Sequence, residues 1–163
     1  MITVLDQGRP SSFDFDAVQA YHGPDAPGGI AHALKLMELA FPLLSPEAPP
    51  ERREIAVATS FGGQGVRDTF ELVTRAVTGG RYEVAAGHGA AQAHLGYRQG
   101  FVYHLSYRSA RQSFVLNEGI VRDEFLVLAG KGAAGRSKDE EMHFAWLKRE
   151  MAERVMSLHA SAV

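Results

Sequence analysis

The chain has 163 residues, of which 45% are hydrophobic and 22% charged, the composition of a globular protein and the length of one domain. Its formal net charge of -2 offers no basic surface, so we expect no nucleic-acid partner. The absence of cysteine excludes disulfides, thiolate nucleophiles and iron–sulfur ligation. With no signal peptide and no apolar run near the roughly 20 residues of a membrane helix, we expect a cytoplasmic protein that does not enter a membrane.

The N-terminal third predicts an extended start followed by two helices. Residues 1–13 hold one short apolar run and are expected to form an arm or edge segment. A short helix begins within 13–18, where acidic residues suit the first turn. A longer, buried helix is expected over 28–41 and should end at Pro42. Its apolar stripe is Ile30, Leu34, Met37 and Phe41.

The middle of the chain predicts a strand, a turn and a helix. Residues 54–59 read as a β-branched strand, and 60–65 as a glycine-rich turn that opens a second helix. That helix keeps its apolar period through Val77, and Gly79–Gly80 should cap it. A short strand is expected over 81–84. The irregular segment 85–100 then has the length of a functional or disordered loop.

The last third predicts a hairpin and then helices. Residues 101–108 alternate apolar and polar side chains, and 112–117 should pair with them. A short helix over 120–129, a flexible link over 130–135 and a final helix to about 159 complete the chain.

This order of elements predicts an α+β fold, a small mixed β-sheet packed with helices. The order is helix, strand, helix and three strands, with C-terminal helices added. We expect one domain over residues 1–163, with 136–159 as a helical extension that begins at a Ser137–Glu140 capping box. Trp146 of that extension is expected in the core or in a dimer contact.

The run Tyr21–Gly29 carries the strongest functional signal. It places His22 and Asp25 three residues apart on a turn stiffened by proline and glycine at a helix start. An imidazole there can bind a metal ion or carry a proton, or it can simply stabilise the turn. Asp25 can serve as a second ligand or as a turn carboxylate.

The glycine-rich turn is a second candidate. Gly62, Gly63 and Gly65 can admit a ligand phosphate or carboxylate to the backbone, or can simply form a tight turn. Asp68 follows in the first turns of the helix and is a candidate general base, or an aspartate stabilised by the helix dipole.

Further histidines supply candidate metal ligands. His88 and His94 lie in the irregular segment and can complete a metal set with His22. His104 lies on the polar face of its strand, for which we expect contact with solvent.

These residues resemble a known family. His22-Gly23 and Pro27-Gly28, followed by a helix rich in alanine and leucine, are similar to the His-Gly-His-x-Cys-Pro-Gly opening of the FmdE family of formylmethanofuran dehydrogenase proteins. The run Thr59–Thr74 with Gly79–Gly80 resembles the family's later strand, turn and helix, and Glu118–Val155 its helical tail.

The resemblance implies an α-β-α fold with three further strands, a homodimer, and in family members a divalent metal, commonly zinc. Here the second motif histidine is replaced by Pro24, and the two motif cysteines by Ala26 and Gly65. Of those motif positions only His22 and Asp68 keep their residues.

Three functions remain open. The first is an FmdE-like protein that binds a small molecule or metal in a cleft around His22 and is not necessarily catalytic; oxygen and nitrogen ligands favour zinc, nickel or iron. The second is a metal-dependent hydrolase or oxidoreductase accessory enzyme, with Asp68 as the base. The third is a dimeric interaction module whose site is vestigial.

Overall fold

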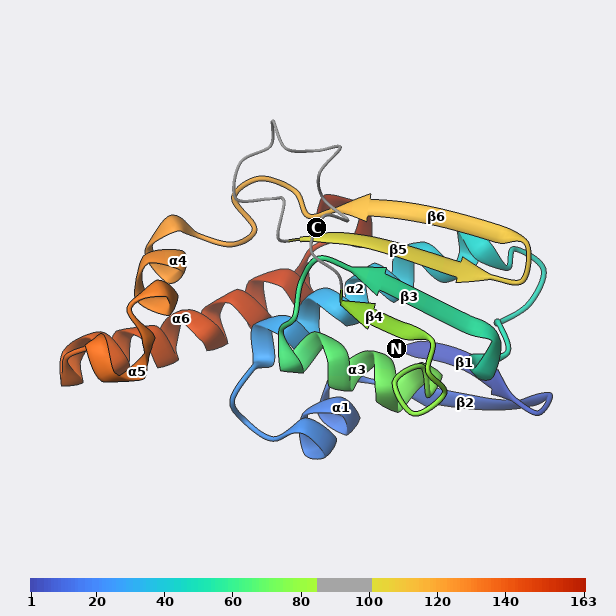
Figure 1. Cartoon of the computed structure of the whole chain (residues 1–163), viewed down its shortest axis with the longest axis horizontal. Coiled ribbons are helices and arrows are strands. Elements are labelled where there is room, and N and C mark those ends of the chain that lie inside the picture. Colours follow the sequence, from blue (N-terminus) through green and yellow to red (C-terminus); the bar gives the residue numbers. More distant parts are fainter. Residues whose placement is uncertain (85–100) are drawn as a thin grey trace.

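The computed structural model describes residues 1–84 and 101–163. Helices pack against a four-stranded mixed sheet, with a separate two-stranded hairpin at the N-terminus (Figure 1). The predicted α+β class is confirmed. In the described residues no helix is both long and apolar enough to cross a membrane.

The N-terminal segment is a β-hairpin rather than the expected arm or edge segment. Strands β1 (Ile2–Asp6) and β2 (Arg9–Phe13) pair in antiparallel register around Gln7 and Gly8, which both have positive φ. Two such residues form the turn that matches the twist of a hairpin. The carboxylate of Glu51 accepts hydrogen bonds from both turn N–H groups, at 3.1 and 2.7 Å. Glu51 is at least 43 positions away from this turn, so the local sequence pattern did not reveal the turn or the second strand.

Helix α1 (Phe15–His22) delivers the chain to His22. The Asp14 side chain caps its start by accepting a hydrogen bond from the Ala17 N–H at 2.9 Å. Gly23 ends it with φ 95°, a conformation that other residues adopt only with strain, and donates its N–H to the Gln19 carbonyl. The end of α1, and with it the position of His22, is therefore set locally.

Helix α2 (Pro27–Leu44) is the centre of the core. Its predicted stripe is fully buried. The helix continues past Pro42, where we expected it to end, because the last turn remains held: Leu44 is buried and the Ser45 N–H donates to the Phe41 carbonyl. The missing proline N–H removes only one hydrogen bond near the helix terminus.

The sheet has the strand order β4-β3-β5-β6. A short 3₁₀ turn leads into β3 (Ile55–Thr59), which pairs in parallel with β4 (Tyr82–Val84) and antiparallel with β5 (Val102–Tyr107). Strand β6 (Ala110–Val115) completes the sheet as the antiparallel partner of β5. The predicted apolar face of β5 is buried. This confirms the mixed sheet.

Helix α3 (Gln64–Thr74) joins β3 to β4 and ends earlier than expected. Its cap is Arg75, in the left-handed conformation with φ 54° and with its N–H donating to the Glu71 carbonyl, rather than Gly79–Gly80. The apolar residues Val66, Phe70 and Val73 are buried against α2 and the sheet.

The C-terminal helices form an arm. Helices α4 (Asp123–Gly130) and α5 (Gly132–Gly135) lie along the first half of α6 (Lys138–Ser157), away from the sheet (Figure 1). The capping box is present, and the expected flexible link contains α5. The second half of α6 enters the main core beside α2, followed by the 3₁₀ turn η3 (Ala160–Ala162). The second half of the predicted C-terminal extension is therefore part of the main core.

Candidate functional site

His22 and Asp68 form a hydrogen-bonded pair between two helices. Nδ1 of His22, the last residue of α1, lies 2.7 Å from Oδ2 of Asp68 in the second turn of α3. The His22 side chain is only 6% exposed and that of Asp68 24%. Two of the residues that the sequence offered as site candidates are thus in direct contact.

The pair orients the His22 ring. Because an ionised carboxylate only accepts hydrogen bonds, Nδ1 carries the proton and donates a hydrogen bond to Asp68. In the neutral ring the lone pair then lies on Nε2, which is buried and has no hydrogen-bond partner among the described residues. A buried nitrogen without a partner carries a desolvation penalty that a ligand would relieve.

Asp68 is engaged through both oxygens. Its Oδ1 accepts a hydrogen bond from Nη1 of the neighbouring Arg67 at 3.1 Å, while Oδ2 contacts His22. These two contacts favour an orienting role over the role of a general base, which would need an oxygen turned toward substrate.

Tyr82 on β4 is a residue that the sequence analysis missed. Its hydroxyl is buried without a partner in the part of the chain that the structure describes. Burial raises the pKa of Tyr82 to about 12, with opposing electrostatic effects of Arg67 and Asp68 on the same phenol. After Nε2 of His22, the Tyr82 hydroxyl is therefore a second buried polar atom without a partner among the described residues, and it lies within electrostatic range of Asp68. A tyrosine in a three-residue strand has no sequence signal that separates it from a core aromatic.

The glycine-rich turn packs against the turn that follows His22. A side chain on Gly65 would place its Cβ 2.7 Å from the Ala26 carbonyl oxygen and 2.9 Å from the Ala26 Cβ. Glycine here lets α3 approach the start of α2 closely. At Gly62 the nearest atom would be 3.7 Å away, on Val84; at Gly63 it would be the ring of Phe61. Close packing against Ala26 thus explains why residue 65 is glycine.

Ala26 and Gly65 are also the two positions at which the resembled family carries cysteine. In this chain they contact each other, and Gly65 lies three residues before Asp68, on the same face of α3. Ala26, Gly65 and Asp68 therefore lie in one region of the fold, and His22 contacts Asp68 there.

The remaining metal candidates are not assembled in the described residues. Asp25 is exposed on the turn between α1 and α2, and His88 and His94 lie outside the described residues. Within residues 1–84 and 101–163, no three histidine, aspartate or glutamate side chains are grouped to hold a metal ion. Among these residues His22 offers one unpartnered ring nitrogen, not a complete set of ligands.

His104 and Trp146 lie outside the His22–Asp68 pair and make contacts of their own. His104 is half-buried, and its Nδ1 lies 2.7 Å from Oγ of Ser113 across the β5–β6 ladder. Trp146 is 47% exposed on α6 and stacks on His143, so it is not in the core of the chain.

Comparisons with family models and with curated proteins found no match to this chain. The family resemblance stays a prediction, carried by the motif residues named above.

Proposed function

We propose that this protein binds a small ligand through Nε2 of His22 and that this ligand is a divalent metal ion, zinc first and nickel or iron as alternatives. The observation that carries the proposal is the 2.7 Å contact between Nδ1 of His22 and Asp68, which leaves Nε2 buried without a partner among the described residues. A metal-binding histidine almost always donates its other N–H to a carboxylate or carbonyl, which fixes the tautomer and the ring orientation.

The chemistry of the site favours a partly open coordination sphere. Without thiolates, the ion would depend on nitrogen, oxygen and solvent ligands. Asp25, His88 and His94 are the further protein ligands that we propose. The close approach of Ala26 and Gly65 supports the proposal, because it brings together the two positions that correspond to the motif cysteines.

We propose binding rather than catalysis as the primary activity. The alternative is a metal-dependent enzyme in which Asp68 acts as the base. Since both oxygens of Asp68 are hydrogen-bonded, we assign Asp68 to positioning His22. A screen for hydrolase activity becomes informative once a metal has been measured.

The test is the metal content of the purified chain. Protein prepared without chelator is analysed for zinc, nickel and iron, then stripped and titrated with zinc against a chromophoric chelator. We expect one equivalent in the wild type and loss of binding in His22→Ala. His22→Gln, which keeps more of the side-chain volume, serves if the alanine variant is unfolded by circular dichroism.

The matched control is His143→Ala. His143 is an exposed histidine on α6, paired with Glu124, so it reports adventitious binding to a surface imidazole. His143→Ala should bind zinc as the wild type does. Equal zinc affinity in the wild type and both His22 variants, or no binding by the wild type, would remove the proposal.

A second proposal is the homodimer, for which the arm supplies a specific observation. Trp146, Met142 and Val127 are 47%, 59% and 62% exposed there, a concentration of apolar surface on α4 and α6. Sedimentation velocity on the wild type and on Trp146→Glu tests it, with Leu43→Glu, at an exposed apolar position on α2, as control. We expect a dimer that only Trp146→Glu dissociates; a monomeric wild type contradicts it.

A further inference from the structure

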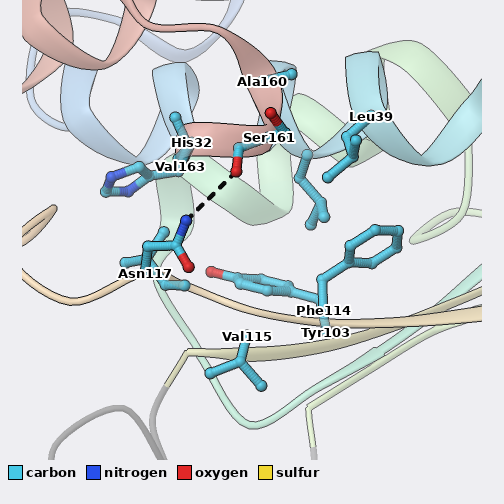
Figure 2. A pocket seen from close by; sticks show the side chains of 11 residues that line it. His32, Leu39, Tyr103, Phe114, Val115, Asn117, Ala160, Ser161 and Val163 are labelled. Carbon is cyan, nitrogen blue, oxygen red and sulfur yellow. Dashed lines mark hydrogen bonds between the residues drawn. The ribbon is translucent and has the colours of Figure 1, made fainter.

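A cavity lies between α2, the sheet and η3, and neither His22 nor Asp68 lines it. Its volume is about 160 Å³. Leu36 and Leu39 of α2 and Phe114 of β6 supply apolar walls. Figure 2 shows Leu39 and Phe114 among the lining side chains. A cavity of roughly 150 Å³ with apolar walls accommodates benzene. The space therefore suits a molecule the size of one aromatic ring.

One end of the cavity is polar. His32 of α2 lines it, is only 6% exposed, and has a buried Nε2 without a hydrogen-bond partner within residues 1–84 and 101–163. Burial, together with the charge of Arg154, lowers the pKa of His32 to about 4, so the ring is neutral at neutral pH. A neutral imidazole offers one donor and one acceptor nitrogen, and it carries no positive charge to offset the burial of an anion.

Tyr103 adds a hydroxyl to the same end. It is 4% exposed, and burial raises its pKa far above the ordinary value, so the phenol keeps its proton. In Figure 2 the hydroxyl points to the end where His32 and Asn117 lie. The Asn117 amide at this end donates to the Ser161 carbonyl at 3.5 Å.

We propose that this cavity binds a small neutral molecule that is largely apolar, about one ring in size, and carries a single hydroxyl or N–H group. The apolar walls take the ring, and the polar group bonds to Nε2 of His32. This relieves a buried nitrogen that has no partner within the described residues. The proposal is independent of the His22 site, because neither His22 nor Asp68 lines this cavity.

Phenol, toluene and benzoate are suitable probes because they share the ring and differ in the polar group. Binding is measured by titration calorimetry, and the site is located by amide chemical-shift changes. We expect one phenol per chain, with shifts centred on Leu36, Leu39 and Val115. Toluene should bind about five- to tenfold more weakly, the factor of one net hydrogen bond. Benzoate should bind more weakly still, because burying its charge here is unfavourable.

Two variants identify the polar end. In His32→Leu, a substitution of similar size, the preference for phenol over toluene should disappear while toluene binding is retained. Tyr103→Phe provides a second test of the same preference if His32→Leu does not fold. His104→Leu, on the opposite face of β5, should retain the wild-type preference.

The absence of saturable phenol binding to the wild type would overturn the proposal. So would shifts located away from the cavity, or a preference for phenol that persists in every folded variant of His32 and Tyr103. Loss of the preference in either variant supports it.

Discussion

Nδ1 of His22 and Oδ2 of Asp68 lie 2.7 Å apart, although 46 positions separate the two residues in the chain. The contact joins the last residue of α1 to the second turn of α3. It gives the imidazole one orientation and leaves its other nitrogen buried without a partner among the described residues.

Replacing Asp68 by alanine should weaken metal binding without removing the ligand atom. Loss of such a carboxylate typically lowers metal affinity about 10- to 100-fold, because the ring is no longer fixed in one tautomer and orientation. Competition titration of zinc measures the change. Arg67→Ala, which removes the hydrogen bond to Oδ1 of Asp68, should lower zinc affinity less. Equal affinities of Asp68→Ala and wild type would contradict the orienting role.

Introducing a thiolate at Ala26 should strengthen the proposed zinc binding. Ala26 contacts Gly65 on the face of α3 that holds Asp68, so a cysteine there adds a ligand that zinc favours. We expect Ala26→Cys to raise zinc affinity at least about tenfold by the same titration. Ser161→Cys, an exposed position on η3, controls for a free thiol elsewhere. No gain, or an equal gain in both, speaks against a metal site at this turn.

Tyr82→Phe should leave the fold intact and stabilise it slightly. The hydroxyl is buried without a partner among the described residues, so removing it relieves a desolvation penalty, by up to about 1 kcal/mol. Urea unfolding measures the free energy of unfolding. A loss of more than about 1 kcal/mol would show that the hydroxyl makes a stabilising hydrogen bond. Phe70→Leu, at the neighbouring ring, should destabilise by contrast.

Gly65→Ala should destabilise the fold, and Gly62→Ala should not. The new methyl at Gly65 lies 2.7 Å from the Ala26 carbonyl oxygen, a contact that forces α3 away from the start of α2 and costs about 1–3 kcal/mol. At Gly62 the nearest atom is 3.7 Å away, an ordinary contact. Urea unfolding of the two variants compares them directly. Equal stabilities would remove the packing role of Gly65.

His32 should make stability fall as the solution becomes acidic. Its pKa of about 4 in the folded protein is below the ordinary value of 6.5, so the unfolded chain binds the proton more readily. The stabilisation is complete above about pH 6.5, declines as pH falls toward about 4, and is lost below that.

At pH 5 the loss from His32 amounts to about 2 kcal/mol relative to neutral pH. Urea unfolding at pH 7.5 and pH 5 measures it, with His32→Leu as the comparison. The decline should be about 2 kcal/mol smaller in His32→Leu, whereas His104→Leu should follow the wild type. Parallel declines in wild type and His32→Leu would contradict a buried neutral histidine.

Helices and strands were predictable from the sequence wherever apolar side chains recur with the spacing of one buried face. The stripe of α2 and the buried face of β5 follow from side-chain spacing alone, because one face of each element must meet the core. Element ends were less predictable. The continuation past Pro42 and the cap at Arg75 depend on neighbouring burial and hydrogen bonds, not on the residue type that usually ends a helix.

His22 and Asp68 were each selected from the sequence, by motif and by position in a helix start. Their pairing, the burial of Nε2 and the presence of Tyr82 nearby were not predictable, since these properties depend on how α1, α3 and β4 pack. The same holds for His32, which the sequence presents as one more residue of a buried helix.

The sequence by itself thus determined the α+β class and the core faces of its main elements, because these follow from composition and short-range periodicity, and it offered His22 and Asp68 as candidates. Only the tertiary structure decided which of those residues meet. Contacts between positions far apart in the chain form when helices and strands pack together, and they decide which polar atom is oriented and which is buried without a partner among the described residues.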